Sequence, residues 1–168
     1  MAEQGRNEEG IAQIQEGLAA SRATGAELMR PRDLCLLAEA RMETGTLDYG
    51  LSSLTEALAT ADEHEHRSYE AETHRLKGEL LLRQNDSNAS EAQSCFQRAI
   101  EIARKQSAKS WELRATISLA RLLAAQGRRN EARTMLADIY NWFTEGFDTA
   151  DLKDARALLD ELNVSDSG

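Results

Sequence analysis

The chain has 168 residues, a single proline, ten glycines and 41% hydrophobic residues, which suits one helix-rich domain with a sizeable core. Its net charge of −9 at pH 7 argues against nucleic acids and anionic membranes as partners, because both repel an acidic protein. No apolar run is long enough to cross a membrane, and the polar N-terminus MAEQGRNEEG has no apolar signal core, so we expect a cytoplasmic protein.

One spacing recurs four times along the chain: a small residue, a large one four positions later, and a small or apolar one three positions after that. Because these positions share one face of a helix, each occurrence predicts a helix that packs closely on a neighbour. The four occurrences, at offsets of 40, 42 and 40 residues, are Gly10-Ile14-Gly17, Gly50-Leu54-Ala57, Ala92-Phe96-Ala99 and Ala132-Leu136-Ile139.

A second helix pattern precedes each of the last three occurrences. It contains a small residue, with a large side chain nine positions earlier, in the pairs Met29/Ala38, Tyr69/Gly78 and Trp111/Ala120. Gly45 and Gly127 lie between the two patterns, where glycine in the left-handed conformation commonly ends a helix. We expect Ser68 and Ser110 to be N-caps. Each unit is therefore predicted to be a helix, a turn and a second helix.

The sequence predicts a single all-α domain over residues 1–168. One hairpin cannot bury its apolar face alone, so the hairpins must stack. Gly5 precedes Gly10 by the same five residues that separate Gly45 from Gly50, so the chain is expected to open at the turn of a hairpin whose first helix is absent. Either it is a fragment, or this exposed helix docks onto a partner. The expected units are a half repeat at 5–25, repeats at 26–64, 65–106 and 107–145, and a charged capping helix at 148–163.

These patterns resemble the tetratricopeptide (TPR) repeat. Ala92-x3-Phe96-x2-Ala99 follows the second half of the TPR motif, and Leu37-Ala38 and Gly78 resemble its Leu-Gly pair. The period of 40–42 is longer than that of the common repeat, and its aromatic residues in the first helix and its final proline are missing here. The resemblance implies a right-handed superhelix of about eight helices in antiparallel hairpins.

Three stretches resemble a narrower group: EEGIAQIQEGLAASRATGAEL, RLKGELLL and NWFTEGFDTADLKDARALLDEL. They are similar to the C-terminal TPR region of large bacterial signalling proteins, in which an adenylate or guanylate cyclase or another effector domain is joined to a predicted ATPase. No phosphate-binding G-x4-G-K-[ST] loop is present in this chain, so the resemblance carries no nucleotide chemistry with it.

The TPR resemblance implies that the first helix of each hairpin lines a concave groove. The groove is expected to run from acidic and mixed charge near Glu39 and Glu43 to basic charge near Arg114 and Arg121, where an acidic peptide would fit. The alternative is that pairs such as Glu79–Arg83 simply satisfy one another at i,i+4 spacing. The candidate groove residues are Arg32, Glu39, Glu43, Glu72, Arg75, Glu79, Arg83, Arg114 and Arg121.

Charge is also uneven along the chain, because residues 104–133 are basic and residues 134–168 acidic. The basic stretch is either a set of solvated helix faces, a site for an acidic ligand, or one side of a head-to-tail contact with an acidic end.

No group of residues predicts catalysis, so no enzyme activity, cofactor or metal is expected. His64 and His66 lie among acids, but their spacing matches no zinc pattern, and a solvated loop is the simpler interpretation. Cys35 and Cys95 are 60 residues apart and are expected to pack as small hydrophobic residues. The residues Trp111, Trp142 and Phe143 are expected to pack between repeats and cap.

The sequence thus favours a non-catalytic scaffold that binds another protein or peptide and serves as the regulatory C-terminal module of a signalling protein. Two alternatives stay open. One is self-association through the open N-terminal half repeat, and the other is an enzyme with an unrecognised site.

Overall fold

The computed structural model describes residues 2–25, 27–63 and 67–164. Within these ranges the chain is all-α, as predicted, and has no strand. Two short 3-10 turns, Glu27–Met29 and Asp86–Asn88, each lead into a helix. The eight α helices are α1 (Ala2–Thr24), α2 (Arg30–Glu43), α3 (Leu47–Glu63), α4 (Glu70–Gln84), α5 (Ala89–Lys105), α6 (Lys109–Ala125), α7 (Arg129–Tyr140) and α8 (Ala150–Val164).

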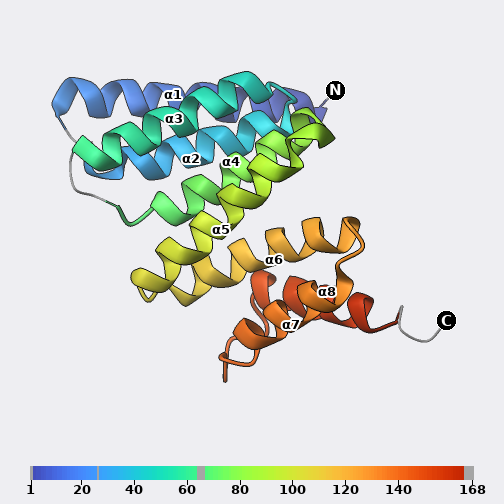
Figure 1. Ribbon diagram of the computed structural model, residues 1–168. Coiled ribbons are helices and arrows are strands. Elements are labelled where there is room, and N and C mark those ends of the chain that lie inside the picture. The colour runs from blue at the N-terminus through green and yellow to red at the C-terminus, as the bar shows by residue number, and fades with distance from the viewer. Residues whose placement is uncertain (1, 26, 64–66, 165–168) are drawn as a thin grey trace.

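The helices follow one another along a single stack, from α1 to α8 (Figure 1). Helices α2 and α3, α4 and α5, and α6 and α7 pack as neighbours within hairpins. We call α2, α4, α6 and α8 the first helices, and each of them also packs on the next one in this series. We call α1, α3, α5 and α7 the second helices, and each packs on the first helix that follows it.

Main-chain geometry, rather than side-chain caps, sets the helix ends. Gly45 and Gly127 have φ values of 74° and 80°, so the predicted left-handed turns are confirmed. The predicted N-caps are wrong: α4 begins after Tyr69 and α6 after Ala108, and neither has a side-chain cap. Before α6, the Ala108 N–H donates to the Ala103 carbonyl at 2.8 Å. This bond closes the turn early and leaves Ser110 inside the helix.

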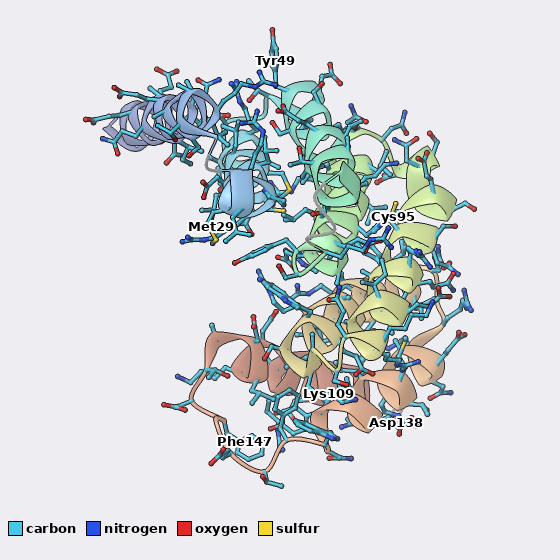
Figure 2. The ribbon with its side chains drawn as sticks, turned by 90° about the vertical axis from the view of Figure 1, so that its left-hand side faces the viewer. Met29, Tyr49, Cys95, Lys109, Asp138 and Phe147 are labelled. Carbon is cyan, nitrogen blue, oxygen red and sulfur yellow. The ribbon has the colours of Figure 1, made fainter. Side chains whose placement is uncertain are left out.

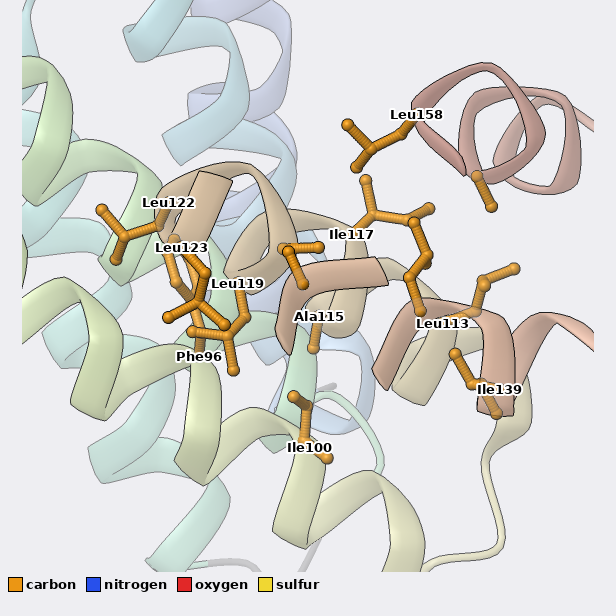
Figure 3. Close-up of a cluster of buried hydrophobic side chains, with 14 of the residues drawn as sticks. Phe96, Ile100, Leu113, Ala115, Ile117, Leu119, Leu122, Leu123, Ile139 and Leu158 are labelled. Carbon is orange, nitrogen blue, oxygen red and sulfur yellow. The ribbon is translucent and has the colours of Figure 1, made fainter. Parts of the chain in front are cut away.

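The repeated small and large residues form the core between the paired helices. Leu54, Phe96 and Leu136 are fully buried. At Gly78, an added Cβ would lie 2.5 Å from the Phe96 ring, so glycine is what allows α4 to approach α5 this closely. In the second half of the stack, α5, α6, α7 and α8 share one apolar cluster, part of which is drawn in Figure 3.

The stack is curved (Figure 2). Met29 and Phe147 lie on the side where the curve opens, and Cys95 and Asp138 lie on the opposite, convex side. One packing prediction is wrong: Trp142 is 57% exposed, with the Lys109 ammonium 5.5 Å from its ring centroid. Phe143, by contrast, packs against the core, as predicted. Among the described residues, no helix is long and apolar enough to cross a membrane.

Candidate functional site

A cleft of about 160 Å³ lies between α2 and the starts of α4 and α6. We call it the first-helix cleft. Four of the nine predicted groove residues line it, together with the buried Cys35 and three side chains that the groove prediction omitted. The predicted four are Arg32, Glu39, Glu72 and Arg114, and the omitted three are Leu36, Tyr69 and Trp111.

Two aromatic rings form one wall of the first-helix cleft. Tyr69 and Trp111 occupy equivalent positions just before α4 and early in α6, which brings their ring centroids to 5.7 Å. Trp111 rests on the buried Ala71, Ile102 and Ala103, and the Arg114 guanidinium lies 5.4 Å from its centroid. Because they are packed from behind, these rings offer a preformed apolar surface to a ligand.

Behind the rings, a carboxylate at the base of the cleft holds two arginines in place. The Glu72 side chain is buried and accepts hydrogen bonds from Arg75 Nε and Nη2 at 2.9 and 2.7 Å. Arg114 Nη1 lies 2.9 Å from the same carboxylate. This buried, charge-assisted network fixes α4 relative to α6.

Glu39 lies at the rim of the network and is only weakly paired. Its carboxylate is 3.8 Å from both Arg75 Nη2 and Arg114 Nη2, which is too long for a hydrogen bond. Burial and the neighbouring Glu72 charge raise the pKa of Glu39, although the two arginines oppose that rise. A ligand that brings a hydrogen-bond donor would satisfy this carboxylate.

The remaining predicted groove residues either pair within the chain or are exposed to solvent. Glu79 pairs with Arg75 at 3.5 Å and accepts from Ser118 Oγ at 2.6 Å, so the expected Glu79–Arg83 pair is wrong. Arg83 donates instead to the Met42 carbonyl at 3.3 Å. Arg32 and Glu43 are exposed, and neither has an ion pair or hydrogen bond within the described part of the chain.

The expected basic half of the groove is already neutralised by α8. Asp154 pairs with Arg121, and Asp151 lies 3.7 Å from Arg114 Nε. Arg129 donates to the Glu161 carbonyl at 2.8 Å. The basic and acidic stretches therefore do meet, but within one chain. Sequence reasoning treated α8 as a cap without placing its acids, so the predicted gradient from acidic and mixed to basic charge did not include them.

The described residues contain no group of three or more His, Cys, Asp or Glu side chains arranged to hold a metal. His64 and His66 lie outside the described residues. Burial raises the pKa of the Cys35 thiol to about 12, and its sulfur lies 3.2 Å from Thr73 Oγ1. Cys35 is therefore a packing residue, since a protonated, buried thiol is a poor nucleophile.

The aromatic wall could have been predicted from the sequence. Tyr69 and Trp111 each lie nine residues before the small residue of their first helix. That spacing locates the first helices, and it also places the two rings at equivalent positions. Two equivalent side chains at the starts of adjacent first helices lie side by side in a stack, which brings these rings together.

No protein-family model matches the chain, and no curated protein matches it. Among solved structures, it is similar to the nearly identical TPR-like repeats of a kinesin light chain-like protein from Podosopora anserina, with a TM-score of 0.67 and 16% sequence identity. The match covers 98% of this chain and 81% of the other. These comparisons give no support to the resemblance to cyclase–ATPase proteins, but the predicted fold class is confirmed: the chain is a TPR-like stack of helical hairpins.

Proposed function

We propose that this chain is a non-catalytic scaffold that binds a peptide segment of another protein in the first-helix cleft. The observation that carries the proposal is the cleft itself. It combines a rigid aromatic wall, the apolar Leu36, the Arg32 guanidinium, which has no ion pair or hydrogen bond among the described residues, and a weakly paired carboxylate at Glu39. Such a set binds an apolar side chain and orients the polar backbone on either side of it.

The test is to select binders from a random peptide library on the whole chain and then measure their affinity for two variants. Glu39→Lys reverses a charge inside the cleft, and Asp138→Lys makes the same change on the convex side. We expect Glu39→Lys to weaken the selected peptides by about ten-fold or more, which is about 1.4 kcal/mol, and Asp138→Lys to have little effect. Peptides that respond only to Asp138→Lys would contradict the proposal.

A narrower form of the proposal is that the bound peptide is acidic. Asp154 already pairs with Arg121, so a ligand carboxylate at Arg121 would compete with Asp154 and gain less affinity than at an unpaired arginine. The change Asp154→Asn should therefore strengthen the binding of an acidic peptide, whereas Arg121→Glu should weaken it. Both side chains are partly exposed, so neither variant should prevent folding. If both variants bind the acidic peptide as the parent chain does, this form of the proposal is wrong.

We further propose that the scaffold serves as the regulatory C-terminal module of a larger bacterial, cytoplasmic signalling protein of the cyclase–ATPase type. The support is the sequence resemblance of residues 8–28, 75–82 and 141–162. Sequencing the gene upstream of Met1 tests it. An in-frame effector domain is expected, and an in-frame stop codon directly before Met1 would contradict it. Self-association through the N-terminal half repeat is the competing role.

A further inference from the structure

A larger cavity than the first-helix cleft lies between the second helices α1 and α3. Its volume is about 600 Å³, which falls within the range of small-molecule sites. Helices α1 and α3 form its walls, and α2, which packs on both of them, forms its floor. We call it the α1–α3 groove. The lining residues that matter most here are Leu18, Ala19, Leu34, Leu37, Arg41 and Tyr49.

The floor of the α1–α3 groove is one face of α2. Its four α2 residues follow one another at intervals of four, three and four, so they form a single stripe along the helix. They are Arg30, Leu34, Leu37 and Arg41. The α2 residues of the first-helix cleft lie about half a turn away around the same helix, and they are Arg32, Cys35, Leu36 and Glu39. The two sites therefore occupy opposite faces of α2.

Arg41 departs from the pattern of the repeat. By the 40- and 42-residue offsets it corresponds to Leu81 on α4 and Leu123 on α6, which are 7% and 2% exposed. Within the described part of the chain, the Arg41 guanidinium has no ion pair or hydrogen bond, and its Nε atom is buried. Because a buried donor without a partner lowers stability, packing alone would favour leucine at this position.

The α1–α3 groove is also positive, although the chain as a whole is acidic. Three arginines and one glutamate line it, which sum to +2, in a chain with a net charge of −9. Arg30 pairs with that glutamate, Glu56, and donates to the Leu18 carbonyl at 3.4 Å. Arg22 and Arg41 have no acidic partner among the residues that the structure describes. The local charge therefore favours an anion.

An aromatic ring and an apolar surface adjoin the Arg41 guanidinium. Tyr49 is 66% exposed and projects from the start of α3 (Figure 2), and its ring centroid lies 5.0 Å from the guanidinium carbon of Arg41. The buried Leu34, Leu37 and Leu18 form the apolar surface. A ligand that fits both parts has an acid group at one end and an apolar body.

We propose that the α1–α3 groove binds a free amphiphilic anion, a molecule with one acid group and an apolar body. The acid group pairs with Arg41, and the body lies along Leu37 and Leu34. The charge-assisted hydrogen bond orients the molecule, and burial of the apolar body supplies the driving force. Because the groove and the first-helix cleft lie on opposite faces of α2, both can be occupied at the same time.

The experiment titrates the whole chain with dodecanoate, below the concentration at which it forms micelles, and follows the heat of binding. We expect saturable binding of one dodecanoate per chain. Dodecyltrimethylammonium has an apolar tail of the same length and a positive head, and it should bind more weakly. The net charge of −9 favours the cation everywhere except at a locally positive site. Equal or tighter binding of the cation would therefore overturn the proposal.

The first pair of variants tests the role of Arg41. Arg41→Leu introduces the residue that the other two hairpins have at this position, so it should leave the fold intact and weaken dodecanoate binding by about ten-fold or more. The matched control is Arg98→Leu, which removes the same charge from a half-exposed position on α5 outside the groove and should have little effect. Equal weakening by the two variants would overturn the assignment to the groove.

A second pair of variants tests the shape of the α1–α3 groove. Ala19 lines the groove and the neighbouring Ala20 does not, and both are exposed, so neither enlargement should prevent folding. Ala19→Trp should fill the groove and weaken dodecanoate binding, whereas Ala20→Trp should leave it unchanged. Absence of binding to the parent chain, or equal binding to these two variants, would overturn the proposal.

Discussion

Glycine has opposite roles at two of the small positions of the repeat, one in a first helix and one in a second helix. A Cβ added at Gly78 would clash with the Phe96 ring, whereas a Cβ added at Gly17 would meet no atom within 4 Å outside its own stretch of helix. The first glycine is required by close packing, and the second only costs backbone entropy in the isolated chain.

We therefore predict that Gly78→Ala destabilises the fold by about 1–3 kcal/mol through overpacking, whereas Gly17→Ala stabilises it by roughly 0.5–1 kcal/mol. Urea unfolding of the two variants measures both effects. Phe96→Leu should recover part of the loss in the Gly78→Ala background, because the smaller side chain relieves the contact. Equal effects of the two alanines would contradict this account of the packing.

Glu112 is a structural residue that sequence reasoning did not single out. It is 3% exposed and accepts from Arg104 Nε and Lys109 Nζ, each at 2.7 Å. Burial alone would raise its pKa, but the two charge-assisted hydrogen bonds outweigh burial and lower it. The carboxylate thus ties the end of α5 to the first turn of α6.

We predict that Glu112→Gln costs about 1–3 kcal/mol at pH 7, because two partly buried hydrogen bonds from cations are weakened. Since the folded pKa lies below the unfolded value, the stability that Glu112 adds is present above about pH 4.5 and is lost as the pH falls through the folded pKa. Unfolding curves of the parent chain and of Glu112→Gln at pH 7 and pH 3 test this sign. The difference in unfolding free energy between the two proteins should be smaller at pH 3. A larger difference at pH 3 would contradict the prediction.

At the scale of elements, the hairpins could be predicted because their signal is local. The small–large–small spacing and the glycine turns lie within about 20 residues, so they locate the helices from sequence alone. The cleft depends on residues more than 30 positions apart, such as Leu36, Tyr69 and Trp111. The repeat register places the two rings side by side, but the position of Leu36 against them depends on the stacking angle. The acids of α8 illustrate the same limit, since nothing local indicated that Asp154 would reach Arg121.

Helix α8 closes the stack by covering α6 and α7. Leu152 is 3% exposed within the shared core, whereas Val164, near the other end of the same helix, is 75% exposed. We predict that Leu152→Ala costs about 2–5 kcal/mol, whereas Val164→Ala costs less than about 0.5 kcal/mol. Thermal unfolding, monitored by circular dichroism, compares the stabilities of the two variants. Similar melting temperatures for the two variants would show that α8 is not part of the cooperative core.

At the scale of the whole molecule, the candidate binding surface is the first-helix cleft, which lies between α2 and the starts of α4 and α6. The net charge of −9 does not describe this surface, because most of the charged side chains in and around the cleft are paired internally. The composition predicted which partners to exclude, whereas the arrangement of side chains was needed to indicate where a partner binds.

The central claim is that the first helices, and not the second helices, hold the partner segment. Hydrogen–deuterium exchange of the whole chain, with and without a peptide selected for binding, tests it most directly. Binding is expected to slow amide exchange in α2, α4 and α6 and to leave exchange in α3, α5 and α7 unchanged. Protection confined to α3, α5 and α7 would contradict it.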